Sequence, residues 1–382
     1  MKDKNVQSVV LIDYFLPKNF YTYELCCELS KFADVTLICK DSYEKKSNEL
    51  FNIKPVLHSK PDRNKVKALK KYLSDLIKIK KIVEEIKPDV LHVEGIIHHE
   101  CEVPFYKILK KHVNVFCFTV HNILPHEAKK SDEKKLISIC SLADMLVVHN
   151  ESSKRLLLDH IGDQKKDNVF VIPHGCYTSY HIKHMETGEP VKFLMFGLLR
   201  KYKGIDILLN AIALLPKEVT KRCHFVIAGN QQKNYDDTDY IAMRNRLNID
   251  EKIVKFDIRF IPDDTLENYF NEADCIIFPY REIYASGALL MAYSFEKPVI
   301  ASNIPVFYEE TCMGKSGLLF EAGSPQQLAN AIESFVKLDK QKLKDYQANV
   351  KQLKDEKYSW EQSAKITAMA YRKVEEKYNE IQ

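Results

Sequence analysis

Short runs of β-branched and aliphatic residues alternate along this chain with segments long enough to form helices. In the first half the runs are QSVVLI (7–12), DVTLIC (34–39), DVLHV (89–93), NVFCFTV (114–120), DMLVV (144–148) and NVFVI (168–172). Strands that alternate with helices build parallel sheets, and nearly continuous apolar runs indicate strands covered on both faces. The first half is therefore predicted to be an α/β domain with a doubly wound parallel sheet.

The same pattern restarts after a polar stretch. The later runs are KFLMFG (192–197), HFVIAG (224–229), KIVKF (252–256), DCIIFP (274–279), PVIAS (298–302) and GLLF (317–320). The intervening segment has no apolar period and ends in Pro190, so we place a linker at 176–190. At about 150 residues per domain, 382 residues suffice for two domains with separate cores. We expect domains at 1–175 and 191–357, and a terminal helix at 358–382.

Composition narrows the class of protein. Lys and Arg total 57 against 53 for Asp and Glu, and a formal charge of +4 is too small to indicate a nucleic-acid binder. Ten cysteines without a C-x-x-C pair indicate a reducing compartment rather than a disulfide scaffold. The first apolar run is interrupted by Asp13 and is too short for the apolar region of a signal sequence. No apolar stretch reaches the roughly 18 residues of a membrane span. We expect a soluble or peripheral protein.

Ligands of doubly wound sheets bind beyond the carboxyl ends of the strands. One such loop, FGLLRKYKG, places Gly197, Arg200 and Lys203 at the start of a helix. Helix amides, the helix dipole and two cations together suit a phosphate. The Gly-rich patterns of P-loop NTPases and of dinucleotide-binding folds are absent. The alternative is that exposed basic residues merely solvate a helix start.

A second loop, FPYREIYASGALL, places Ser286 and Gly287 before another helix. Ser is a preferred N-cap, and Gly lets the backbone approach a ligand closely. Two anion-binding helix starts in one domain indicate a diphosphate, while ordinary helix capping by Ser286 is the alternative.

In the first domain, polar residues follow the run 114–120. His121 and Asn122 come first, and His126 and Glu127 lie a few residues on. This position is where the fold class keeps substrate-binding groups, so His121 is a candidate for hydrogen bonding or proton handling. A structural histidine is the alternative.

Two strings resemble metal sites. Asp237-Thr238-Asp239, preceded by Asp236, contains an Asp-x-Asp, which we interpret as a solvated loop. His98-His99-Glu100-Cys101 is rich in ligand types, but adjacent residues seldom face one metal. We assign no metal.

Residues 60–87 carry ten Lys or Arg against four Asp or Glu. Leu69, Leu73, Leu76, Val83 and Ile86 mark an apolar stripe on the predicted helix. A basic amphipathic helix suits an anionic membrane surface. The alternative is a helix packed on the core with a solvated basic face.

Taken together, several motifs resemble one family. They are TVHNILPHE, VIPHG, FGLLRKYKG, FIPDDTLENYF, ADCIIFPYRE, SGALLMAYSFEKPVIAS and SGLLFEAGSPQQLANAI. In this order they resemble the retaining glycosyltransferases of the GT-B fold that are related to sucrose and glycogen synthases, the glycosyl transferases group 1. The resemblance implies two Rossmann-like domains that face a cleft, with the C-terminal helix crossing back to the first.

The resemblance also implies roles for single residues. Lys203 matches the family lysine that neutralises the diphosphate of a UDP- or GDP-sugar donor. The usual arginine is replaced by Leu198, and Arg200 is a displaced substitute. Glu282 is the candidate contact to the donor sugar, one residue off the usual spacing, while Met291 occupies the position of the ribose contact. His121 matches the first-domain histidine near the donor sugar.

The implied function is metal-independent, retaining transfer of a sugar to a saccharide or lipid-linked acceptor, without a cofactor. The implied setting is cytoplasmic synthesis of a surface polysaccharide, with or without peripheral contact at the inner membrane face. Two alternatives stay open: a catalytically inactive partner subunit of the same fold, and a nucleotide-sugar epimerase. The sequence does not identify the sugar, the base, the acceptor, the linkage or the oligomeric state.

Overall fold

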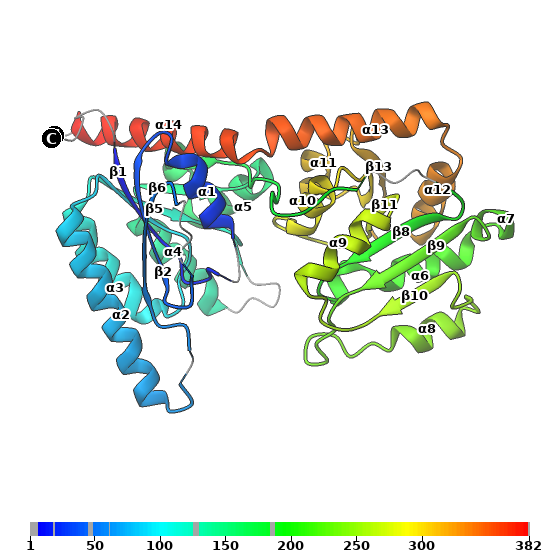
Figure 1. Ribbon diagram of the computed structural model, residues 1–382, viewed down its shortest axis with the longest axis horizontal. Helices are drawn as coiled ribbons and strands as arrows, with labels where there is room; N and C mark the ends of the chain where they lie inside the picture. Colours follow the sequence, from blue (N-terminus) through cyan, green and yellow to red (C-terminus); the bar gives the residue numbers. More distant parts are fainter. Residues whose placement is uncertain are drawn as a thin grey trace. The chain divides into compact units, whose positions relative to one another are not determined.

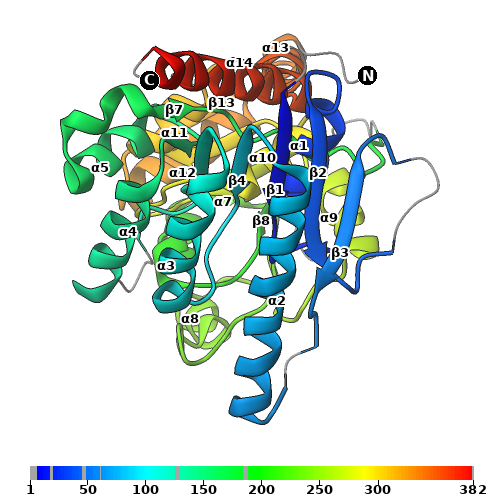
Figure 2. The same ribbon diagram turned by 90° about the vertical axis from the view of Figure 1, so that its left-hand side faces the viewer.

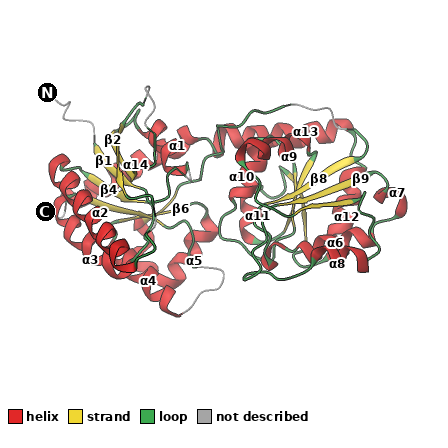
Figure 3. Ribbon diagram, turned by 60° about the horizontal axis from the view of Figure 1, so that its bottom comes forward, coloured by secondary structure: helices red, strands yellow, loops and turns green. Residues whose placement is uncertain are grey.

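The computed structural model describes residues 7–17, 20–44, 49–60, 62–124, 130–183 and 188–380. The chain forms two compact units. Unit 1 comprises residues 1–175 and 359–382, and unit 2 comprises residues 176–358. In each unit a central sheet lies between layers of helices (Figures 1 and 3).

The sheet of unit 1 is parallel throughout and has the order β3-β2-β1-β4-β5-β6-β7. Its strands are β1 (Ser8–Ile12), β2 (Asp34–Lys40), β3 (Asn52–Leu57), β4 (Val90–Val93), β5 (Val115–Thr119), β6 (Met145–Val148) and β7 (Val169–Val171). The helices are α1 (Tyr21–Leu29), α2 (Lys65–Ile86), α3 (His99–Leu109), α4 (Lys130–Leu142), α5 (Glu151–Ile161) and α14 (Trp360–Asn379), with short 3₁₀ turns η1 (Lys110–His112) and η2 (Asp163–Asn168). The strand order reverses between β1 and β4, where such sheets bind ligands.

The strand β3 is the one described strand of unit 1 that the sequence pattern did not indicate. It contains Pro55, which cannot donate a hydrogen bond to a neighbouring strand. The structure places β3 at the edge of the sheet, where a strand tolerates proline.

The terminal helix α14 packs against α1 and β5 of unit 1. Trp360 at its start contacts the rings of Tyr21 and His174, with ring centres 5.2 and 5.1 Å apart. A Cβ on Gly175 would lie 2.3 Å from the Trp360 ring, so only glycine permits this approach. The chain thus returns to unit 1 after completing unit 2.

Unit 2 has a parallel sheet of order β10-β9-β8-β11-β12-β13. Its strands are β8 (Val191–Phe196), β9 (Cys223–Ala228), β10 (Val254–Asp257), β11 (Cys275–Phe278), β12 (Val299–Ser302) and β13 (Gly317–Phe320). The helical elements are η3 (Lys201–Lys203), α6 (Ile205–Leu214), α7 (Lys217–Thr220), α8 (Tyr240–Arg246), α9 (Asp263–Glu272), α10 (Gly287–Ser294), α11 (Pro305–Glu310), α12 (Pro325–Val336), α13 (Lys340–Gln352) and the π-helical turn η4 (Leu353–Lys357). Buried apolar residues from both sheet faces form its core.

The predicted linker, 176–190, is described at 176–183 and 188–190, and its first part is hydrogen-bonded to the rest of unit 2. The Tyr177 amide donates to Ser294 Oγ at 2.8 Å, and the Lys183 amide donates to Asn271 Oδ1 at 2.8 Å. Its polar composition therefore reflects hydrogen bonding to unit 2 at these points as well as exposure to solvent.

Candidate active site

The loop after β8 contains the residues predicted to bind phosphate. Gly197 has φ +118°, and a Cβ there would lie 2.7 Å from Nζ of Lys203. Gly204, with φ +71°, would place a Cβ 2.0 Å from the carbonyl oxygen of Pro279. Both positions require glycine. The two glycines allow a tight turn at the carboxyl end of β8, in contact with the loop after β11.

Lys203 is buried in this turn, with 6% of its surface exposed. Among the described residues its Nζ has one hydrogen bond, to the Phe196 carbonyl at 3.4 Å, and lies 5.1 Å from the centre of the Tyr280 ring. Burial, and then the charge of Arg200, lower the pKa of Lys203 to about 8. A buried ammonium is costly unless a negative charge or several acceptors compensate it. Lys203 is therefore suited to receive an anion.

Arg200 lies half-buried at the start of the turn. Its guanidinium stacks on the ring of Tyr235, 4.3 Å from the ring centre. This cation–π contact orients the guanidinium. The positive charge of Arg200 lowers the pKa of Lys203. Leu198, at the position of the family's usual arginine, is exposed.

Arg281, which was not among the predicted site residues, connects the turn to the loop after β11. Its amide donates to the Tyr202 carbonyl at 2.7 Å. Its guanidinium donates to the Lys201 carbonyl at 2.7 Å and to both carboxylate oxygens of Asp206, at 3.1 and 2.6 Å. A bidentate pair of this kind fixes orientation as well as distance. Arg281 thus positions the turn that contains Lys203.

Ser286 caps α10, its Oγ accepting a hydrogen bond from the Leu289 amide at 3.2 Å. The Ser286 side chain therefore acts as a helix N-cap, which was the alternative to phosphate binding. Gly287 follows at the exposed helix start, and Glu282 is exposed in the same loop. Because β8 and β11 are neighbouring parallel strands, both loops leave the same edge of the sheet. The predicted donor-site residues of unit 2 thus come from two adjoining loops, and their contacts with a donor remain a prediction.

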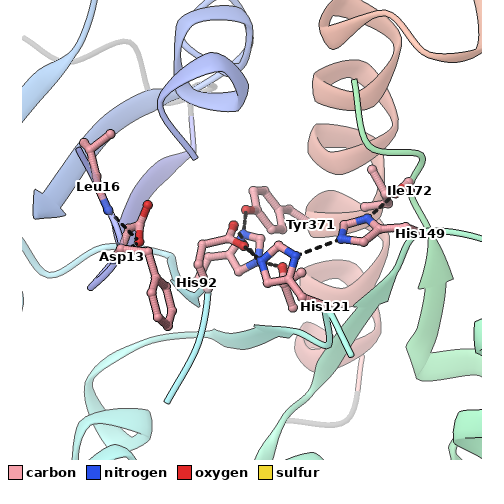
Figure 4. A network of polar contacts seen from close by, with 10 residues as sticks. Asp13, Leu16, His92, His121, His149, Ile172 and Tyr371 are labelled. Atoms are coloured by element: carbon pink, nitrogen blue, oxygen red, sulfur yellow. Dashed lines mark hydrogen bonds and ion pairs between the residues drawn. The ribbon is translucent and has the colours of Figure 1, made fainter. Parts of the chain in front are cut away.

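In unit 1, three neighbouring strands end in polar side chains that form one chain of contacts. Glu94 follows β4, His121 lies beyond β5 and His149 follows β6. His121 Nε2 lies 3.1 Å from Glu94 Oε2, and His121 Nδ1 lies 3.0 Å from His149 Nε2. His149 Nδ1 lies 3.0 Å from the Ile172 carbonyl oxygen. Figure 4 shows His121 between His92 and His149.

Burial has the largest effect on the pKa values of His121, His149 and Glu94. It lowers the pKa of His121 to about 4, against an opposing effect of Asp13. Burial and then His121 lower the pKa of His149 to about 3. Burial raises the pKa of Glu94, against smaller effects of His92 and Thr119. All three groups are therefore shifted toward their neutral forms.

A pocket of about 430 Å³ opens beside Glu94 and His121. Its other walls include Phe15, Thr119 and Asn122, with Lys135 from α4. The sequence predicted His121 at this place but missed Glu94 and His149. The available signal was the same in all three cases, a polar residue directly after a buried strand. His126 and Glu127 lie outside the described residues.

The two strings resembling metal sites have other roles in the described chain. Asp236 is buried and accepts hydrogen bonds from the Tyr240 hydroxyl and the Thr238 amide, so the solvated-loop interpretation is wrong for this residue. Asp239 caps α8 through the Ala242 amide. His99 Nε2 contacts the Lys135 carbonyl. No group of three or more His, Cys, Asp or Glu among the described residues is arranged to hold a metal ion.

Two family models match the chain and together span most of it. Residues 178–353 match "Glycosyl transferases group 1", and residues 19–180 match "Glycosyltransferase Family 4". With two Rossmann-like units and a C-terminal helix that returns to the first, the fold is that of a GT-B glycosyltransferase. The matches and the fold together identify a GT-B glycosyltransferase in which residues 178–353 belong to the glycosyl transferases group 1.

Solved structures with the same fold cover nearly the whole chain. The Anabaena protein HepE, crystallised in complex with UDP, has a TM-score of 0.71 at 16% identity, over 96% of this chain and 100% of that one. Sucrose-phosphate synthase from Thermosynechococcus elongatus has a TM-score of 0.71 at 17% identity, over 96% and 99% of the two chains. At these identities the likeness concerns the fold.

Curated relatives are more similar in sequence but are matched in part. A D-inositol 3-phosphate glycosyltransferase of Corynebacterium aurimucosum is 27% identical over 62% of this chain and 58% of its own length. A GDP-mannose:glycolipid 4-beta-D-mannosyltransferase of Xanthomonas campestris is 25% identical over 48% of each chain. The chain thus spans about half to three-fifths of the length of these relatives.

Proposed function

We propose that this protein transfers a sugar from a UDP- or GDP-sugar bound in unit 2 to a saccharide or lipid-linked acceptor bound in unit 1. The observation that carries the proposal is the buried ammonium of Lys203, which has one long hydrogen bond among the described residues and lies beside Arg200. A diphosphate would supply the negative charge that this pair lacks. The UDP bound by HepE is consistent with such a donor.

Departure of a sugar from a nucleoside diphosphate leaves negative charge on the β-phosphate. Cations and helix amides fixed near that phosphate stabilise the transition state more than the ground state. Arg200, Lys203 and the first turn of α10 would supply this stabilisation, a role that a metal ion fills in other enzymes. We therefore propose metal-independent transfer, with retention as in the resembling family. Glu282 is the proposed hydrogen-bonding contact to the donor sugar, and His121 is proposed to contact it through the exposed edge of its ring.

A ligand panel tests the donor assignment. We expect UDP or GDP, but not both equally, to raise the melting temperature, because a ligand that binds only the folded state stabilises it by mass action, by about 2.7 kcal/mol at a hundred times Kd. Labelled nucleotide sugars then distinguish the activities. Transfer or hydrolysis that persists in EDTA supports the proposal, binding without turnover indicates an inactive subunit, and an isomerised donor indicates an epimerase.

The helix α2 bears on a lipid-linked acceptor. The apolar residues of this helix, which include Leu69, Leu73, Leu76 and Val83 of the predicted stripe, divide into two faces. Leu76, Ile79 and Val83 are buried, whereas Val66, Leu69, Leu73 and Ile77 are 43–63% exposed. These four residues, the outer face of α2, follow helical spacing along one side. The N-terminal end of α2 extends past α3 (Figures 1 and 2).

Basic residues flank this outer face. Arg63, Lys67, Lys70 and Lys81 are all exposed. Apolar side chains between lysines suit an interfacial helix, because the apolar side enters the headgroup region while each Lys or Arg gains about 1 kcal/mol near anionic lipid. No described helix has the length and apolar sequence to cross a membrane. We propose peripheral contact through the outer face of α2.

Vesicle flotation tests this contact. The double variant Leu69→Ser/Leu73→Ser should bind anionic vesicles about tenfold more weakly than the native chain, because it loses apolar area from the outer face. Ile108→Ser, which removes an exposed side chain from α3 of the same unit, is the matched control and should bind as the native chain does. Equal binding to neutral vesicles, or binding insensitive to high salt, would contradict an electrostatic contact.

A further inference from the structure

The hydrogen bonds among Glu94, His121 and His149 in unit 1 determine which ring nitrogen of each histidine carries a proton. A carbonyl oxygen only accepts, so His149 donates from Nδ1 to the Ile172 carbonyl. His149 is shifted strongly toward its neutral form, which leaves a lone pair on Nε2. His121 must then donate from Nδ1 to His149 Nε2, 3.0 Å away. Neutral His121 therefore presents a lone pair, not a proton, at Nε2.

That lone pair faces Glu94 Oε2 at 3.1 Å. A carboxylate oxygen and an imidazole lone pair repel each other, so one proton must lie between them. The proton can formally reside on either partner, giving a neutral pair or an ion pair. The surroundings decide between the two forms.

The groups that face Glu94 offer little support for a negative charge. From the described elements packed around it they are Asp13 after β1, Tyr21 and Cys26 of α1, His92 of β4, Cys117 and Thr119 of β5, His121 beyond β5 and Tyr371 of α14. None of them is a lysine or arginine. His92 is shifted toward its neutral form by burial, and its Nε2 is 2.7 Å from Thr119 Oγ1. A neutral Glu94 and a neutral His121 best fit this setting.

The second oxygen of Glu94 remains available. Oε1 is fully buried and has no hydrogen-bond partner among the described residues. His92 Nε2 lies 3.4 Å from Oε1 but also contacts Thr119 Oγ1, and the Thr119 hydroxyl itself interacts with the Glu94 carboxyl. A buried carbonyl oxygen of a carboxylic acid without a donor is costly to leave unpaired. Because Glu94 is one of the residues that line the 430 Å³ pocket, a ligand hydroxyl that reached Oε1 would supply the missing donor.

We propose that Glu94 is a protonated, neutral acid that donates from Oε2 to His121 and accepts from the hydroxyl of a neutral polyol or saccharide at Oε1. The proposal rests on unit 1 being the acceptor side of the proposed reaction, and it specifies the acceptor's chemistry at this point. Glu100 and Asp132 also line the pocket, against Lys135 as its one lysine or arginine among the described lining residues. This balance favours an uncharged hydroxyl over a phosphate. Glu94 is thus a binding and positioning residue that fixes the His121 tautomer.

Two substitutions separate this assignment from a conventional carboxylate. Gln reproduces a protonated Glu, because its amide donates to His121 while its carbonyl still accepts a hydroxyl. Glu94→Gln should therefore retain binding of methyl α-glucoside, followed by ligand-observed NMR, within about threefold of the native chain. Glu94→Leu should lose at least about tenfold, because it removes both hydrogen bonds. Glucose 6-phosphate should bind more weakly than methyl α-glucoside to the native chain.

A spectroscopic measurement places the proton independently of any ligand. The infrared difference spectrum of the native chain minus Glu94→Gln at neutral pH should contain the C=O band of a protonated carboxylic acid. A carboxylate band in its place, or loss of methyl α-glucoside binding in a folded Glu94→Gln protein, would overturn the proposal. Stronger binding of glucose 6-phosphate would overturn the neutral-ligand assignment.

UDP binding provides the control for the proposed function. We expect all Glu94 variants to bind UDP as the native chain does, because the donor is assigned to unit 2. If native protein binds neither UDP nor GDP, the proposed function fails, while the infrared band still reports the state of Glu94. If nucleotide binds and the acid band is missing, the further inference fails alone.

Discussion

Replacing Lys203 with methionine should weaken binding of the nucleoside diphosphate by about tenfold to a hundredfold. A charge-assisted hydrogen bond contributes about 1.5–3 kcal/mol, and 1.4 kcal/mol corresponds to a factor of ten in affinity. Methionine keeps the length of the buried stem, so the turn between Gly197 and Gly204 should keep its shape. Because the free ammonium is buried with one long hydrogen bond among the described residues, the empty protein should be no less stable than the native chain. Isothermal titration with UDP and GDP, with thermal melting of the empty protein, measures both effects.

The neighbouring Lys201 provides a matched control for this charge change. Its side chain is 69% exposed and its ammonium lies 3.8 Å from the Asp237 carboxylate, a weak surface pair. Lys201→Met should leave nucleotide affinity within about twofold of the native value, because an exposed lysine is well solvated in the empty protein. Equal losses in the Lys201 and Lys203 variants would indicate a general effect of surface charge. Unchanged affinity in Lys203→Met would contradict the proposed diphosphate site.

The pH dependence of nucleotide binding should differ between the native chain and Lys203→Met. The pKa of Lys203 in the empty protein is lowered to about 8, and a bound diphosphate would raise it. Affinity should therefore be highest below pH 8 and fall as the pH rises above it, because the neutral amine that then predominates must take up a proton on binding. Lys203→Met should lack this alkaline decline.

The arrangement of the strands and of the phosphate-binding turn follows from local sequence. Apolar runs that end in Gly or in a polar residue mark strand ends, so Gly197, Lys203 and His121 were predictable positions. Contacts between segments that are far apart in the sequence were not predictable. The Arg281 guanidinium meets Asp206 from 75 residues away, and no local spacing indicates that pair. Asp236 was assigned to solvent because its burial depends on the later Tyr240.

The contacts among Glu94, His121 and His149 in unit 1 show the same limit to prediction from local sequence. Each of Glu94, His121 and His149 is a single polar residue after a strand, and a structural role for each is the simpler interpretation. Their chemistry arises because β4, β5 and β6 are adjacent in a parallel sheet, which aligns the three strand ends. The pairing of strands, and not the composition of any loop, thus produces the site.

Acid should destabilise unit 1 through its buried histidines. The pKa of His149 is lowered to about 3 by burial and by His121, and the pKa of His174 is lowered to about 3 by burial and by His149. The unfolded chain binds protons at these groups near pH 6.5, whereas the folded chain does not. The free energy of unfolding should therefore fall as the pH drops from about 6.5 toward 3, by about 1.4 kcal/mol per pH unit for each histidine. Glu94 opposes this trend, because its pKa is raised in the fold.

The substitution His149→Asn isolates one of these contributions. Asn keeps a donor near the position of Nδ1 for the Ile172 carbonyl but cannot be protonated. The variant's unfolding free energy at neutral pH should be lower, because His121 loses its acceptor, yet it should decline more slowly with acid. Between pH 6 and 4 the difference in slope from the native chain should approach one proton, about 1.4 kcal/mol per pH unit. Thr367→Ala, which removes a buried hydroxyl from α14 in the same unit, controls for lower stability without loss of a titrating group. Urea unfolding at a series of pH values measures the slopes, and parallel curves for native and His149→Asn proteins would show that His149 already ionises normally in the fold.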